Sequence, residues 1–359
     1  MRVVVTGVGV VAAGLAGGAD ALRSFLAAPP ATSTGRVEDA MLSGLLAGVD
    51  ARRTSRVSRL AVAAGRLALD DAGLGDAEAA AFVMGTEHGD LHSTIEFADG
   101  YLRAGPQGLS PLLFPNTVMN TMASATTIAV ATRGPSLTLN ARTVGGELAV
   151  ARASRTIAAG RAEVALAGGV DERDPLVEEV LGDLGGGAER RGEGATVLVL
   201  EAVDHARARG ATPLGEIRGA AWRGLAARPN GVGRVVESRA IGAALIEAGI
   251  DASAIGWVYG SASGDGPRDA WERALLSRAL GREVPIASLA PLLGQHAGLG
   301  ALRVAAAAWT ARSGRWVEPA WDGAPRLTDV APGPGLVHGI ARGGTHVALI
   351  IDGPPDDAD

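Results

Sequence analysis

The most informative features of the sequence are absences. No cysteine occurs among the 359 residues, which excludes disulfides, thiolate metal ligands and every mechanism that uses a thiol nucleophile. No lysine occurs either, so all 33 basic residues are arginine and Schiff-base chemistry is excluded. The net charge of −6 at pH 7 argues against a general nucleic-acid-binding protein, which would carry a basic surplus.

Long apolar runs are also missing. The sequence contains no run of roughly 18–20 apolar residues, the length that a membrane-spanning helix needs. Residues 1–19 begin like a signal peptide, but Arg2 is their only basic residue and glycines interrupt the valine run, so a buried strand fits better. With 47% hydrophobic and 20% charged residues, we expect a cytoplasmic globular protein of one or two domains.

Predicted strands alternate with predicted helices along the chain. Apolar, β-branched runs that end at glycine predict strands at 2–11, 80–84, 137–139 and 163–167. Helical spacing of apolar residues predicts helices at 19–27, 52–72 and 148–159, the last two ending before Gly73 and Gly160. This alternation predicts an α/β fold with largely buried sheets.

An internal repeat relates the two halves of the sequence. Residues 68–74 (ALDDAGL) reappear as 244–250 (ALIEAGI), and 82–85 (FVMG) reappear as 257–260 (WVYG). Each copy reads as a helix, a glycine stop, a short linker and a buried strand. A period of about half the chain predicts two similar units packed together. We place them at 1–205 and 206–353, followed by a disordered acidic tail at 354–359.

Four segments resemble, in order, segments of the β-ketoacyl synthases. They are the opening strand 4–11 (VVTGVGVV), the stretch from 134 through 169 that begins GPS and ends AGG, the strand 192–201 (GEGATVLVLE) and the loop 343–346 (GGTH). The resemblance implies a thiolase fold. That is an α/β fold of two pseudo-repeated halves in a layered αβαβα arrangement, and it is usually dimeric.

The same resemblance identifies degenerate catalytic positions. Condensing ketosynthases as a family use a cysteine nucleophile, two histidines and a lysine. The corresponding residues here are Thr143 for the cysteine, Ser261 for the first histidine, Ala290 for the lysine and Gln295 for the second histidine, with His296 one place along. A threonine hydroxyl without an adjacent base is a poor nucleophile, and serine and glutamine do not shuttle protons. We therefore expect no catalytic residues.

A ketosynthase-like chain without its nucleophile is similar to the chain-length factor, or ketosynthase β subunit, of type II polyketide synthases. The resemblance implies a heterodimer with a catalytic ketosynthase α subunit, which docks the acyl carrier protein, and a tunnel that sets polyketide length in this acyltransferase complex. A highly reducing, polyene-making system is the preferred subclass. One alternative is an enzyme of the same fold that uses Thr143 or His296 for altered acyl transfer or malonyl decarboxylation. The other is a standalone binding or scaffold protein.

In the family, the segment before the nucleophile strand crosses the dimer axis and reaches the partner's cavity. Here that segment is 112–122, in which Phe114, Val118, Met119 and Met122 are candidates to line the acyl tunnel and interface. Methionine adapts well to flexible aliphatic guests. Ordinary core packing is an equally open interpretation of these residues. Arg342 occupies the position of the family's gating phenylalanine.

Two weaker signals indicate a cofactor or a metal ion. The pattern Gly7-x-Gly9-x-x-Ala12 fits a dinucleotide fingerprint, but the acidic residue expected about 20 positions later does not follow in a strand. His88 and His92 have the spacing of two ligands on one helix face, yet nearby glycines indicate a loop and no third ligand is evident. We expect neither a cofactor nor a metal.

A basic cluster of Arg52, Arg53, Arg56 and Arg59 begins the helix predicted at 52–72. Such a patch attracts acidic carrier proteins. The favoured interpretation is a solvated helix face that is partly paired with Asp70 and Asp71.

Overall fold

The computed structural model describes residues 1–30, 33–48, 54–183, 189–318 and 325–355. Within these ranges, an 11-stranded sheet runs in the order β4-β3-β5-β6-β1-β7-β13-β12-β8-β9, with β2 paired to β1. The strands before residue 205 are β1 (Val3–Ala12), β2 (Leu15–Gly17), β3 (Ala81–Thr86), β4 (Ser136–Asn140), β5 (Val164–Asp171) and β6 (Gly194–Ala202). The later strands of the sheet are β7 (Gly215–Gly224), β8 (Val258–Tyr259), β9 (Ile286–Ala287), β12 (Gly335–Ile340) and β13 (Thr345–Asp352).

The strand order shows the internal symmetry. Read from its two ends, the sheet matches β4 with β9, β3 with β8, β5 with β12, β6 with β13 and β1 with β7. The pairing directions also match, because β3–β5 and β8–β12 are parallel whereas β5–β6 and β12–β13 are antiparallel. A short antiparallel contact of Val3–Val5 with Gly215–Ile217 joins the halves. The predicted two-fold repeat is confirmed, and the boundary at residue 205 stays a prediction.

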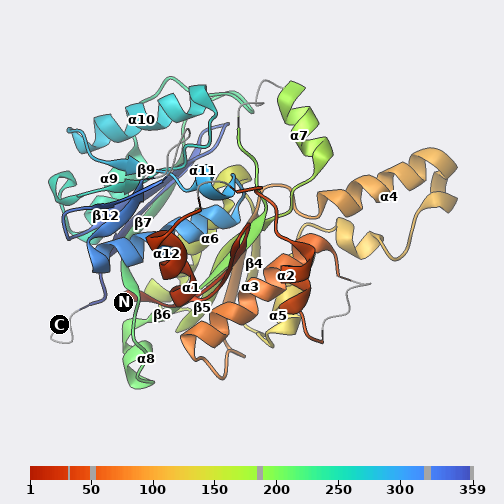
Figure 1. Ribbon diagram of the computed structural model, residues 1–359, viewed down its shortest axis with the longest axis horizontal. Coiled ribbons are helices and arrows are strands. Elements are labelled where there is room, and N and C mark those ends of the chain that lie inside the picture. The colour runs from red at the N-terminus through yellow and green to blue at the C-terminus, as the bar shows by residue number, and fades with distance from the viewer. Residues whose placement is uncertain (31–32, 49–53, 184–188, 319–324, 356–359) are drawn as a thin grey trace.

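Helices form the outer and middle layers (Figure 1). Helices α6 (Gly145–Ala158) and α12 (Gly298–Ser313) contact each other and strands of both halves, so they form the middle layer. Helix α3 (Arg56–Ala72) covers β1 and β6, and α9 (Arg239–Ala248) covers β7 and β13. The result is the predicted αβαβα arrangement. The remaining helices are α1 (Ala19–Ala27), α2 (Asp39–Gly44), α4 (Leu91–Ala104), α5 (Thr121–Ala129), α7 (Pro175–Leu181), α8 (Val203–Ala208), α10 (Gly266–Leu280) and α11 (Ala290–Leu293).

Glycines fix two parts of this architecture. Helices α3 and α9 end at Gly73 and Gly249, which have left-handed φ angles of 58° and 66°, as helix-ending glycines commonly do. Gly9 lies within β1, where a Cβ atom would come 1.9 Å from the carbonyl oxygen of Ala64 in α3. The glycines of the dinucleotide-like pattern therefore allow a helix to approach a strand, rather than forming a phosphate-binding turn.

The interpretation of the basic cluster as a solvated face is wrong for Arg56. Helix α3 starts at Arg56, and Arg52 and Arg53 lie outside the described residues. Arg56 binds Glu193 at 2.6 Å and Asp39 at 2.5 Å. Asp71 instead accepts hydrogen bonds from the backbone N–H groups of Val8 and Ala19. Long-range partners, rather than helix neighbours, thus bind both Arg56 and Asp71.

Helix α4 and the 3-10 turns that follow it, Gly105–Gly108 and Phe114–Thr117, extend away from the body of the molecule (Figure 1). Beside this lobe, β4 is an edge strand that pairs only with β3 among the described strands. A small hairpin of β10 (Arg315–Glu318) and β11 (Arg326–Asp329) lies apart from the main sheet. Among the described helices, none combines the length and apolarity that crossing a bilayer requires.

Candidate functional site

Thr143 lies where a strand turns into the central helix. Strand β4 leads to a 3-10 turn at Arg142–Val144, and α6 starts at Gly145. Arg142 has a left-handed φ of 51°, an uncommon conformation for a non-glycine residue that is concentrated at functional sites. Thr143 is buried, and its Oγ1 has no hydrogen-bond partner among the described residues. The geometry of a nucleophile turn is therefore present without a base on the hydroxyl.

Ser261 is held by a buried carboxylate. Its hydroxyl donates to Glu272 Oε1 at 2.8 Å and accepts from the N–H of Ile340 at 3.1 Å. His338 Nδ1 lies 2.8 Å from the same Glu272 oxygen. Burial raises the pKa of Glu272, but the hydrogen bond and charge of His338, the Ser261 N–H and the Arg268 charge together outweigh burial and hold the pKa below its usual value. Both hydrogen bonds of the Ser261 hydroxyl are thus made within the protein.

Gln295 contacts the nucleophile position directly, because its Nε2 donates to the Thr143 carbonyl oxygen at 3.3 Å. His296 is fully buried beside the Gly194 backbone. Burial, together with the charges of Arg191 and Arg303, lowers the pKa of His296 to about 3. His296 is therefore neutral at pH 7.

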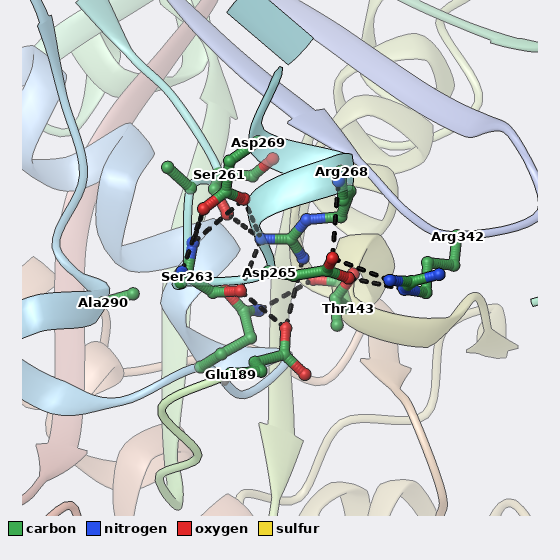
Figure 2. A network of polar contacts seen from close by, with 12 residues as sticks. Thr143, Glu189, Ser261, Ser263, Asp265, Arg268, Asp269, Ala290 and Arg342 are labelled. Carbon is green, nitrogen blue, oxygen red and sulfur yellow. Dashed lines mark hydrogen bonds and ion pairs between the residues drawn. The ribbon is translucent and has the colours of Figure 1, made fainter. Parts of the chain in front are cut away.

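The guanidinium of Arg268 lies between Thr143 and Ser261 (Figure 2). Its Nη2 donates to the Ser261 carbonyl oxygen at 2.6 Å and to Ser263 Oγ at 2.5 Å, and it contacts Asp269 at 3.0 Å. Its Nη1 lies 3.3 Å from Glu189. In Figure 2, Thr143 lies on one side of this guanidinium, and Ser261 and Ala290 lie on the other. Thr143 and Ser261 thus border one buried cluster. Ala290 makes no polar side-chain contact with it.

A second ion pair, between Arg342 and Asp265, lines the cavity beside Thr143. Arg342 binds Asp265 with two hydrogen bonds of 2.5 and 2.7 Å and donates to the Asn230 carbonyl oxygen at 3.1 Å. Arg142 donates to the Asn230 side chain at 3.1 Å. A bidentate arginine–carboxylate contact is among the stronger polar interactions in proteins. Arg342, which lines the cavity beside Thr143, is therefore held in place by polar contacts.

The cavity that remains beside Thr143 measures about 60 Å³. Each of its carboxylates faces an arginine: Glu87 faces Arg191, Glu189 faces Arg268, and Asp265 faces Arg342. This space suits a few water molecules, not an acyl chain. Sequence reasoning missed Glu189, Asp265, Arg268 and Glu272. None of them belongs to a motif that the sequence analysis identified, and Arg268 and Glu272 lie in α10, where charged residues normally indicate a solvated face.

The four tunnel candidates separate into two environments. Phe114, Val118 and Met119 are 59%, 47% and 42% exposed on the surface of the projecting lobe. Met122 is fully buried in the core beneath α3, so the structure does not bring it to that surface. Met119 also lies near the site, because its Sδ is 3.5 Å from Nδ2 of Asn140 at the end of β4.

The two histidines with metal-like spacing do not converge. His88 lies in the loop after β3, 3.6 Å from Glu87. His92 is in the first turn of α4 and contacts Asp174 at 3.2 Å. The described residues contain no group of three His, Cys, Asp or Glu side chains arranged to hold a metal ion.

Comparison with known proteins gives a consistent family. A model of the β-ketoacyl synthase N-terminal domain matches residues 22–177. The "Putative polyketide beta-ketoacyl synthase 1" of Streptomyces halstedii is 31% identical over 360 residues, covering 85% of this chain and 84% of that protein. The 3-oxoacyl-[acyl-carrier-protein] synthase 2 of Vibrio harveyi is 28% identical over 282 residues, covering 69% of this chain and 66% of that protein.

Solved structures share the fold. A structure described as the ishigamide ketosynthase/chain length factor superposes with a TM-score of 0.83 at 24% identity and covers 99% of both chains. A type II polyketide ketosynthase in complex with its acyl-carrier protein gives a TM-score of 0.80 at 19% identity, covering 98% of this chain and 99% of that chain. The predicted thiolase-type fold and the resemblance to polyketide ketosynthases are confirmed. This chain belongs to the β-ketoacyl synthase family.

Proposed function

We propose that the chain is a non-catalytic subunit that pairs with a catalytic ketosynthase and shapes the acyl tunnel that sets polyketide chain length. The observation that carries this proposal is the filled pocket beside Thr143. Condensation needs a nucleophile, a base and room for the acyl group. The threonine hydroxyl here has no base within the described chain, and paired charges occupy the space around it.

The exposed edge of β4 supports pairing with another chain. A free strand edge presents unpaired backbone groups to which a partner strand can add. Leu137 on β4 is 38% exposed, and the neighbouring lobe exposes Phe114 and Met119. An apolar surface beside a free edge is typical of a protein interface. The relative described as a ketosynthase/chain length factor suggests that the partner is a ketosynthase.

Co-expression with a cysteine-containing ketosynthase tests the pairing. We expect a one-to-one complex by size-exclusion chromatography and mass determination. Leu137→Asp should weaken it about tenfold or more, because a charge would be buried at the interface. Ile246→Asp is the matched control, since Ile246 is exposed on α9 in the opposite outer layer. Equal effects of the two substitutions would place the interface elsewhere.

The chain alone distinguishes this role from an enzyme with altered acyl-transfer or decarboxylating chemistry. Incubated without a partner, it should take up no acyl group from acyl carrier protein and release no carbon dioxide from malonyl carrier protein, as judged by mass spectrometry. An acyl adduct that disappears in Thr143→Ala would establish the enzymatic alternative.

The length-setting role makes a separate prediction for Met119. Enlarging this side chain in Met119→Trp should shorten the polyketide that the complex makes, because the residue lies beside the end of β4, which leads to Thr143. Ile246→Trp should leave the product distribution unchanged. Products of unaltered length from a correctly assembled Met119→Trp complex would exclude Met119 from the tunnel.

A further inference from the structure

A second, larger cavity lies outside the degenerate site. It measures about 430 Å³, within the range of small-molecule sites. The N-terminal ends of α3, α4 and α7 border it, together with the end of β5. None of the four degenerate catalytic positions lines it.

One wall carries two carboxylates whose hydrogen-bonding capacity is only partly used. Asp90 is 3% exposed and caps α4 through Oδ1, which accepts from the N–H of Ser93 at 3.0 Å. Its buried Oδ2 has no partner in the described part of the chain, and the same is true of Glu172 Oε1. Burial and then the nearby Asp90 charge raise the pKa of Glu172 to about 7. A buried acceptor without a donor is costly, so this wall is suited to a ligand that donates hydrogen bonds.

Another side chain that lines the cavity is a guanidinium. Arg59, in the first turn of α3, lines the cavity, and its buried Nε–H finds no acceptor among the described residues. Arg56, the first residue of α3, also lines the cavity, but its guanidinium already binds Glu193 and Asp39. The N-terminal end of the 17-residue α3 adds a positive field. This wall is suited to an anionic group.

We infer that this cavity binds a small zwitterion, whose ammonium group contacts Asp90 and Glu172 and whose carboxylate contacts Arg59. An ammonium supplies three donors and a positive charge to two carboxylate acceptors, and a carboxylate accepts from a guanidinium. A single molecule that carries both groups satisfies the unpartnered acceptors and the unpartnered donor together.

Titration calorimetry of the full 359-residue chain with glycine, β-alanine and γ-aminobutyrate tests the inference. Ethylammonium and acetate, which each carry one of the two charged groups, are the control probes. At least one zwitterion should bind about tenfold more tightly than either control. No measurable binding of any zwitterion, or acetate binding as tightly as the best one, would overturn the proposal.

Substitutions that replace a carboxylate with an uncharged amide test whether the zwitterion binds in this cavity. Asp90→Asn keeps a good helix cap, and Glu172→Gln keeps the side-chain volume. Each should weaken the best zwitterion about tenfold, whereas Glu96→Gln, an exposed acid on α4, should have no effect. Circular dichroism confirms that each variant is folded. Unchanged affinity in both cavity variants would place the zwitterion elsewhere.

The pH dependence is an independent readout. His92, Asp174 and Glu193 act on Glu172 together with Asp90, and Glu172 is the group in this cavity whose pKa lies near 7. An ammonium ligand prefers the ionised carboxylate, so affinity should rise between pH 6 and pH 8. Glu172→Gln should abolish most of this rise. An affinity that falls with pH over this interval would contradict the assignment.

Discussion

Two cavities lined by charged side chains differ in how those charges are satisfied. Beside Thr143, every carboxylate that lines the cavity faces an arginine, and about 60 Å³ remains open. Around Glu172, the cavity measures about 430 Å³, and Asp90 and Glu172 each keep a buried oxygen without a partner in the described ranges. The number of charges is therefore a poor guide to a binding site. What distinguishes the two cavities is whether the protein already satisfies its own groups.

The largest expected effect is a loss of folding free energy when a charge is removed from the ion pairs beside Thr143. Arg268 is 1% exposed and contacts Glu189, Asp269 and Ser263. Arg268→Met keeps most of the volume but leaves buried carboxylates without their cation, and removing one partner of a buried pair costs about 3–5 kcal/mol. Urea denaturation measures this loss. A loss below about 1 kcal/mol would mean that the cluster is solvated.

A buried histidine beside this cavity gives a second test. His296 has a pKa of about 3 in the folded protein, compared with about 6.5 in an unfolded chain. The unfolded state therefore binds more protons between these values. Stability is fully present above about pH 6.5 and falls by up to about 1.4 kcal/mol per pH unit as the pH drops.

In His296→Asn this contribution disappears. The stability of the variant should depend less steeply on pH between 6.5 and 4, although its absolute stability is lower because a buried side chain is shortened. Unfolding curves at several pH values compare the slopes. Identical slopes in wild type and variant would show that His296 gains a proton at its ordinary pKa.

The sequence predicted the architecture better than the site. The repeat of helix, glycine and strand predicted the two-fold arrangement, because Gly73 and Gly249 end equivalent helices. The ends of helices and strands depend on local signals, such as glycine after a helix, and these signals can be recognised in the sequence. The start of α3 is an exception, since its first arginine is fixed by distant Glu193.

The polar contacts of both cavities escaped prediction. Arg342 and Asp265 are 77 residues apart, and Arg268 lies within a helix whose charges suggest a solvated face. The resemblance to ketosynthases identified Thr143 and Gln295, which the structure brings into contact. It gave no indication that charged groups far apart in the sequence would line the cavity beside Thr143. Such pairings depend on tertiary packing, which local periodicity does not encode.

The smallest expected effect is a gain in stability, in contrast to the loss expected for Arg268→Met. Glu172 has a pKa of about 7 in the folded protein and an ordinary value near 4.3 when unfolded, so its ionised form destabilises the fold. This penalty is absent below about pH 4, grows between the two values and is complete above about pH 7. Glu172→Gln should therefore stabilise the protein by about 1–2 kcal/mol at pH 8, after allowance for partial exposure.

At pH 4 the same variant should nearly match the wild type, since Glu172 is then largely protonated in both the folded and the unfolded state. Glu189→Gln is the paired control, because Glu189 contacts Arg268, Arg191 and Ser263 and its neutral form should destabilise the fold at pH 8. Thermal melts of the two variants at both pH values decide the comparison. If both substitutions destabilise at pH 8, Glu172 is already paired in solution and the contrast between the two cavities fails. Opposite signs would establish that unsatisfied charge, which costs stability in the ligand-free chain, marks the cavity around Glu172 as the one that gains from binding a ligand.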